Sequence, residues 1–97
     1  MTLDSFNQLT PAEEERLAML MEECSEIIQI GCKILRHGYA SYHPQDPQRT
    51  SNRRLLEKEV EDAKAIMELM RGDLTNGRET SVFDVIARKR PYMHHQD

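Results

Sequence analysis

Hydrophobic side chains recur every three or four positions over two long stretches of the chain, the spacing that places them on one face of an α-helix. The first stretch follows Thr10-Pro11-Ala12-Glu13, which combines a capping threonine, a proline at the first helical position and a glutamate three residues after the cap. Gly38 is a typical helix stop. We therefore expect a first helix between Thr10 and Gly38. Its inward face is predicted to consist of Leu17, Leu20, Met21, Cys24, Ile27, Ile28, Gly31, Ile34 and Leu35.

A second helix is predicted to begin at a cap formed by Ser51 or Asn52 and to end near Gly72 and the sequence LTNG. The stretch between the two helices, residues 38–51, contains two prolines and shows no periodicity, so we expect a long loop there. The inward face of the second helix is predicted to consist of Leu55, Leu56, Val60, Ala63, Ile66, Met67 and Met70.

A third, shorter helix is predicted over about residues 80–91, beginning near Ser81. Its hydrophobic residues Val82, Phe83 and Ile86 are expected to face inward. The predicted fold class is therefore all-α, with two long antiparallel helices plus a short third helix.

We expect these helices to form a single domain. Its core is predicted to lie in residues 10–72 and to be interrupted by the long loop over residues 38–51. The last residues, PYMHHQD, are expected to form a frayed tail, which places His94 and His95 outside the domain core.

The composition narrows the class of protein. Charged residues make up 31% of the chain, and the net charge is -4, which argues against binding to nucleic acid because such binding depends on basic patches. No hydrophobic run approaches the roughly 20 residues needed to cross a bilayer, and the sequence MTLDSFNQLT has none of the features of a signal peptide. We therefore expect a cytoplasmic protein without a membrane partner. Cys24 and Cys32, about 12 Å apart on one helix, are expected to be unpaired.

Three glutamates interrupt the first hydrophobic face, in the sequence LMEECSEII. At about 100° per residue, Glu23 and Glu26 lie side by side at the edge of that face, whereas Glu22 is turned towards solvent. On the second helix, Glu59 falls within the hydrophobic arc and Asp62 at its edge. The hydrophobic residues that flank these acids are Met19, Ile30, Ile34, Leu55, Ile66 and Leu69.

Burying ionised carboxylates without compensation costs several kcal/mol each, so these acids need positive partners. Lys58 and Lys64 are expected to point away from them, and Lys33 is a single charge. A divalent cation resolves the conflict because it accepts several carboxylates at once. Without His or Cys at ligand spacing beside the acids, we expect Mg²⁺, with Mn²⁺ as an alternative, rather than zinc.

The ordered pair Glu22-Glu23-x-x-Glu26 and Glu59-x-x-Asp62 resembles the EExxE…ExxD signature of the MazG-like, all-α nucleoside triphosphate pyrophosphatases. The resemblance covers residues 10–72 and implies a Mg²⁺-dependent hydrolase that splits an NTP or dNTP into the monophosphate and pyrophosphate. It also implies that Glu23, Glu26, Glu59 and Asp62 hold the metal and that Glu22 orients a water in the catalytic site.

Two features depart from that family. The loop between the motifs is longer than in compact members, and Glu61 precedes Asp62 where relatives often have a glycine.

Basic and aromatic residues are candidates for contact with the nucleotide. Lys33, two turns beyond the first acidic motif, can neutralise phosphates. The run Arg88-Lys89-Arg90 either does the same or forms a solvated helix end, where cations suit the helix dipole. Tyr39, Tyr42 and His43 either stack on the base or pack on the domain.

Two or three helices are too few to shield such a site from solvent. Hydrophobic residues beside the acids indicate that the first two helices have a second buried face. We therefore expect a homodimer or homotetramer that completes a four-helix-type bundle around each site, as the resemblance also implies. The alternative is a non-catalytic helical module that binds a nucleotide or a protein and pairs its acids with lysine and arginine. A di-iron bundle ranks last because it expects Glu-x-x-His on its helices.

Overall fold

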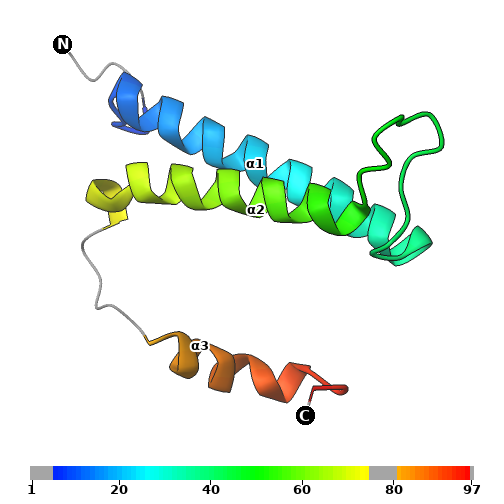
Figure 1. Ribbon diagram of the computed structural model, residues 1–97. Coiled ribbons are helices and arrows are strands. Elements are labelled where there is room, and N and C mark those ends of the chain that lie inside the picture. Colours follow the sequence, from blue (N-terminus) through cyan, green and yellow to red (C-terminus); the bar gives the residue numbers. More distant parts are fainter. Residues whose placement is uncertain (1–5, 75–80, 97) are drawn as a thin grey trace.

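The structure, a computed structural model, describes residues 6–74 and 81–96. Within these ranges the chain forms α1 (Pro11–His37), α2 (Asn52–Leu69) and α3 (Val82–Lys89), with short 3₁₀ helices η1 (Arg71–Leu74) and η2 (Arg90–Tyr92). Helices α1 and α2 lie side by side and antiparallel, as a long hairpin (Figure 1). The only β-type pairing in the described part of the chain is one isolated bridge between Tyr42 and Ser51. The prediction of an all-α fold is therefore confirmed.

Helix α1 begins and ends where the sequence predicts. The Thr10 hydroxyl accepts a hydrogen bond from the Glu13 backbone N–H at 3.1 Å, and the Glu13 carboxylate accepts one from the Thr10 N–H at 2.8 Å, which completes a capping box. At the other end, Gly38 has a φ of 87°, and its N–H donates to the Ile34 carbonyl at 2.7 Å. Glycine adopts a positive φ with little strain, so the helix stops after His37.

Helix α2 is capped by Ser51, whose hydroxyl accepts a hydrogen bond from the Arg54 N–H at 3.1 Å. Beyond its C-terminus, η1 is tied back to α1 by an ion pair between Arg16 and Asp73. The Arg16 Nε and one terminal nitrogen donate to the two Asp73 oxygens at 2.7 and 2.8 Å. This pairing lowers the pKa of the Asp73 carboxyl. It also fixes the open end of the hairpin.

The interior of the hairpin is small. The hydrophobic side chains buried in the described residues are Ala63, Ile66 and Met70, which are 2%, 7% and 4% exposed. All three belong to the inward face predicted for the second helix. Helix α1 contributes no buried side chain, and it meets α2 through half-buried residues such as Leu20, Ile27 and Ile34.

The inward face predicted for α1 is wrong in part. Four of its members are exposed: Leu17 to 41%, Met21 to 65%, Ile28 to 66% and Leu35 to 88%. The reason is that hydrophobic residues spread over more of the α1 circumference than one neighbouring helix can cover. Helix α2 covers the side that carries Glu23 and Glu26, so the opposite edge of the stripe faces solvent.

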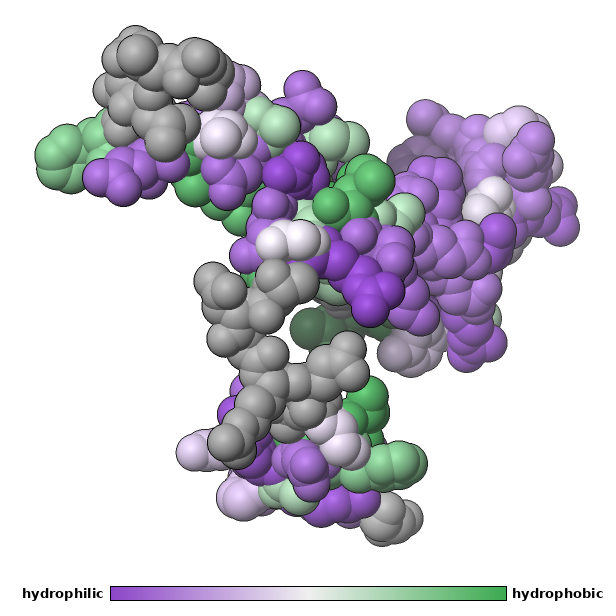
Figure 2. Space-filling model, turned by 90° about the vertical axis from the view of Figure 1, so that its left-hand side faces the viewer, coloured by the Kyte–Doolittle hydropathy of each residue, from purple (hydrophilic) through white to green (hydrophobic). Residues whose placement is uncertain are grey.

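Helix α3 begins as predicted, because the Ser81 hydroxyl accepts a hydrogen bond from the Phe83 N–H at 3.1 Å. Its hydrophobic residues are not buried, however. Val82 and Phe83 are 70% and 82% exposed, and Ile86 is 38% exposed. The expectation that they face inward is wrong for the single chain, because α3 lies apart from the hairpin (Figure 1). Figure 2 shows hydrophobic side chains on the surface of both parts.

The chain exposes more surface than a compact monomer does. Its solvent-accessible surface is 8556 Å², whereas a folded monomer of 11.3 kDa exposes about 5,700 Å². Its radius of gyration is 17.6 Å, against about 12.5 Å for a compact domain of this length. Much of the hydrophobic surface of the single chain therefore remains in contact with solvent.

Two further expectations can be compared with the structure. Cys24 and Cys32 are both free, as predicted. Among the helices of residues 6–74 and 81–96, none is long and hydrophobic enough to span a membrane.

Candidate metal centre

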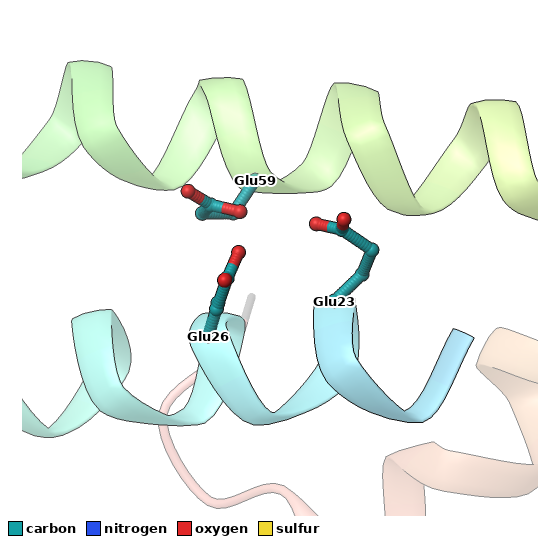
Figure 3. Close-up of side chains that lie close together, drawn as sticks. All are labelled: Glu23, Glu26 and Glu59. Carbon is teal, nitrogen blue, oxygen red and sulfur yellow. The ribbon is translucent and has the colours of Figure 1, made fainter. Parts of the chain in front are cut away.

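Three glutamate side chains from two helices meet between α1 and α2. One carboxylate oxygen from each of Glu23, Glu26 and Glu59 lies within 4.8 Å of the other two. Figure 3 shows Glu23 and Glu26 pointing from α1 towards α2, and Glu59 pointing back from α2. We call these three residues the acidic cluster.

Helix periodicity brings the acidic cluster together. Glu23 and Glu26 are three residues apart, so they are neighbours on the side of α1 that faces α2. Glu59 lies one turn before Ala63, a residue that is 2% exposed. The Glu59 side chain itself is only 15% exposed, which confirms its predicted place within the hydrophobic arc.

The electrostatics of the cluster are unfavourable without a cation. Glu23 Oε2 and Glu59 Oε2 are buried and have no hydrogen-bond partner among the residues that the structure describes. Burial, followed by the charge of Asp62 and a hydrogen bond with Glu59, raises the pKa of Glu23. A hydrogen bond with Glu59, followed by the charge of that carboxylate, raises the pKa of Glu26 to about 7. With a pKa of about 7, the Glu26 carboxyl keeps its proton in about half of the molecules at neutral pH.

Asp62 lies beside the acidic cluster rather than within it. Its Oδ2 is 3.4 Å from the Lys58 Nζ, which is also 3.8 Å from Glu59 Oε1. The expectation that Lys58 points away from the acids is therefore wrong, because a lysine four residues before an aspartate reaches it along the helix surface. Hydrogen bonding to Asp62 raises the pKa of Lys58. The two side chains are 61% and 44% exposed, so this pair contributes little to stability.

Glu22 is exposed and lies outside the cluster, as its helical angle predicts. Its backbone carbonyl accepts a hydrogen bond from the Ser25 hydroxyl at 2.7 Å. The side chain is next to Glu23 in sequence but on the outer side of α1, so a role in orienting water stays a prediction.

The loop of residues 38–51, which we call the connecting loop, turns back over the last turns of α1 and encloses a pocket of about 400 Å³. Three candidate nucleotide-binding residues, Lys33, Tyr42 and His43, line this pocket. Tyr39 is not among the lining residues. It is 49% exposed, and the guanidinium carbon of Arg53 lies 5.1 Å from the centre of its ring.

The basic run Arg88-Lys89-Arg90 is not brought to the acidic cluster. It spans the end of α3 and the start of η2, and all three side chains are exposed. Figure 1 shows this part of the chain apart from the hairpin. His94 and His95 follow η2 and are exposed, in keeping with the predicted tail.

Sequence reasoning missed part of the pocket. Arg36 and His37 line it beside Lys33, and Asn52 contributes from the start of α2. The spacing of Lys33, Arg36 and His37 places them on one helix face, which can be recognised from the sequence alone. The return of the connecting loop onto that face has no comparable local signal.

The acidic cluster suits a hard cation. All of its ligand atoms are carboxylate oxygens, which Mg²⁺ and Mn²⁺ accept readily. The oxygens of the cluster lie within 4.8 Å of one another. Metal binding stays a prediction. Comparisons of the chain with models of known families, with characterised proteins and with solved structures find no match.

Proposed function

We propose that this protein is a Mg²⁺-dependent nucleotide pyrophosphohydrolase that splits an NTP or dNTP into the monophosphate and pyrophosphate. The observation that carries the proposal is the convergence of three carboxylates from α1 and α2, two of which have a buried oxygen without a partner. Buried carboxylate oxygens that accept no hydrogen bond are unfavourable, and a divalent cation would complete the arrangement. The motif resemblance described above supports the reaction type.

The proposed roles follow from the positions of the side chains. Glu23, Glu26 and Glu59 hold the cation, and Asp62 joins them when Lys58 turns away into solvent. When bound, the cation supplies positive charge against the triphosphate and makes a water more acidic. The side chain of Lys58, which is 61% exposed, can then reach the added negative charge of the nucleotide.

The protein is proposed to work as a homodimer or homotetramer in the cytoplasm. The large exposed surface supports this assembly, as do Met21 and Ile28, which are 65% and 66% exposed on α1. A second copy that covers them would form a four-helix-type bundle around each acidic cluster. Light scattering after size exclusion tests the assembly. We expect Ile28→Glu to lower the measured mass and Gln29→Glu, an exposed polar neighbour, to leave it unchanged.

A non-catalytic helical module that binds a protein or a nucleotide is the second candidate. The observation in its favour is the exposure of Val82 and Phe83 on α3, since exposed hydrophobic residues of this size often mark an interaction surface. In that case, the acids pair with basic side chains of a partner instead of a metal.

The deciding experiment measures products from a panel of NTPs and dNTPs, with Mg²⁺ and with a chelator. The proposal expects equal amounts of monophosphate and pyrophosphate from at least one nucleotide, and only when Mg²⁺ is present. Release of inorganic phosphate and a diphosphate instead would contradict the reaction type. Nucleotide binding without turnover at saturating Mg²⁺ and Mn²⁺ would favour the second candidate.

A further inference from the structure

The pocket at the loop end of the hairpin is distinct from the acidic cluster. Lys33, in its wall, follows Glu26 by seven residues, which is about 10 Å along the α1 axis. The pocket volume of about 400 Å³ lies within the range of small-molecule sites. Its charged and hydroxyl-bearing lining consists of Lys33, Arg36, His37, Ser41, Tyr42 and His43, and we call it the basic pocket.

The wall contributed by the connecting loop is held in place by hydrogen bonds to its own ends. Asn52, which is 2% exposed, donates from its side-chain amide to the Gly38 carbonyl at 3.1 Å and from its backbone to the Ser41 carbonyl at 2.8 Å. The Arg53 N–H donates to the Tyr39 carbonyl at 2.9 Å. The pocket is therefore formed before any ligand arrives.

The acid nearest to the pocket along the loop is already engaged. Asp46 accepts hydrogen bonds from the backbone N–H groups of Thr50 at 2.8 Å and Gln48 at 2.9 Å. These bonds lower the pKa of the Asp46 carboxyl and keep it directed into the loop. Since none of the described lining residues is an acid, positive charge dominates the basic pocket.

Two permanent cations in the pocket are available to a ligand. Within residues 6–74 and 81–96, neither Lys33 nor Arg36 has an ion-pair partner. Cations in the last turn of a helix suit its dipole, which accounts for Arg36 and His37. That explanation does not extend to Lys33, one turn earlier, or to His43, which comes from the loop.

The remaining groups add donors. His43 Nδ1 accepts a hydrogen bond from the Gln45 N–H at 3.1 Å, so in the neutral ring the proton lies on Nε2, which is a donor. The guanidinium carbon of Arg49 lies 5.8 Å from the centre of the ring of Tyr42, one of the lining residues. An ammonium, a guanidinium fork, an imidazole N–H and hydroxyls together match the several oxygens of a phosphate better than the two of a carboxylate.

We propose that the basic pocket binds a phosphate group, carried by a nucleotide or by inorganic pyrophosphate, and that it does so without a metal at the acidic cluster. Phosphate binding at this site depends only on the residues that line the basic pocket. The binding proposal can therefore be correct even if the proposed hydrolase activity is not, and the reverse also holds.

Calorimetric titration of the full chain with inorganic pyrophosphate, in the presence of a chelator, tests the proposal. We expect binding whose dissociation constant rises about tenfold or more in Lys33→Gln and in Arg36→Gln. Lys64→Gln, which removes an exposed lysine from α2, is the matched control and is expected to bind as the wild type does. Circular dichroism checks that each variant keeps its helical content. In the unaltered chain, pyrophosphate should also shift the NMR signals of the Tyr42 and His43 rings.

A parallel titration with ADP identifies the source of the phosphate. Tighter binding of ADP than of pyrophosphate, weakened by Tyr42→Ala, supports a nucleotide as the ligand, whereas equal or weaker binding supports inorganic pyrophosphate. The proposal is overturned if neither compound binds at ~10 mM. It is also overturned if binding persists unchanged in both Lys33→Gln and Arg36→Gln.

Discussion

The affinity of the acidic cluster for Mg²⁺ or Mn²⁺ is expected to rise about tenfold between pH 6 and pH 8. The reason lies in Glu26, whose pKa is raised to about 7 by its hydrogen bond with Glu59 and by the charge of that carboxylate. A cation needs these oxygens without their proton, so protons and metal ions compete for the same site.

The magnitude follows from the titration of one group. With a pKa of about 7, the ionised fraction of Glu26 rises from about 10% at pH 6 to about 90% at pH 8, and the apparent affinity rises in proportion. Binding at pH 7 should release about half a proton per ion from this residue. The pKa of Glu23 is also raised, mainly by burial, so its titration acts in the same direction.

Calorimetry with Mn²⁺ at three pH values, each in two buffers of different ionisation enthalpy, measures both the affinity and the protons released. Glu26→Gln should weaken binding and reduce its dependence on pH. Glu57→Gln, which changes an exposed acid of α2, should leave both unchanged. Equal affinity of the unaltered protein at pH 6 and pH 8 would refute the reasoning.

Three further perturbations address neighbouring parts of the structure. The melting temperature of the metal-free protein should fall as pH rises from 5 to 8, because the raised pKa of Glu26 lets the folded chain keep a proton that the unfolded chain loses near 4.5. Mg²⁺ should reverse this fall, and a flat profile would contradict the assignment. Lys58→Met should strengthen metal binding severalfold because it frees Asp62 to bind the metal, and Lys64→Met is the control. Weaker metal binding in Lys58→Met would contradict the proposal that Asp62 exchanges Lys58 for the metal. Asn52→Ala should lower the free energy of unfolding in urea by about 1–3 kcal/mol, because it removes a buried amide that anchors the connecting loop. A loss below about 0.5 kcal/mol would count against that role.

Features set by short-range interactions could be predicted from the sequence. The cap formed by Thr10 and Glu13 needs only residues three apart, and the stop at Gly38 needs only a residue that tolerates a positive φ. The meeting of Glu23, Glu26 and Glu59 follows from a fixed rotation of about 100° per residue on two helices. Metal binding at that meeting point stays a prediction.

Features that depend on which side of a helix its neighbour covers could not be predicted in the same way. Met21 and Ile28 belong to a continuous hydrophobic stripe, yet α2 covers only part of the α1 circumference, so both are exposed. Helical angles also gave the wrong direction for Lys58, because they locate the Cα and not the end of a long flexible side chain. Its Nζ reaches Asp62 at 3.4 Å.

Contacts between residues far apart in the sequence were the hardest to predict. Arg16 and Asp73 are 57 positions apart and pair at 2.7 Å. The buried Asn52 was predicted only as a helix cap, although its side chain anchors the connecting loop through Gly38. The basic pocket depends on that loop, so its full lining could be recognised only in three dimensions.

The central claim is tested most directly by measuring pyrophosphate release from the best nucleotide of the panel in the presence of Mg²⁺. The assay compares the unaltered chain with Glu59→Gln and Glu57→Gln. Glu59→Gln removes one carboxylate of the acidic cluster and keeps the size of the side chain, so the variant should keep its helical fold and yet lose turnover. Glu57→Gln, whose side chain is 53% exposed and pairs with Arg54 at 3.3 Å, should retain it. Turnover in Glu59→Gln equal to that of the unaltered chain would contradict the account.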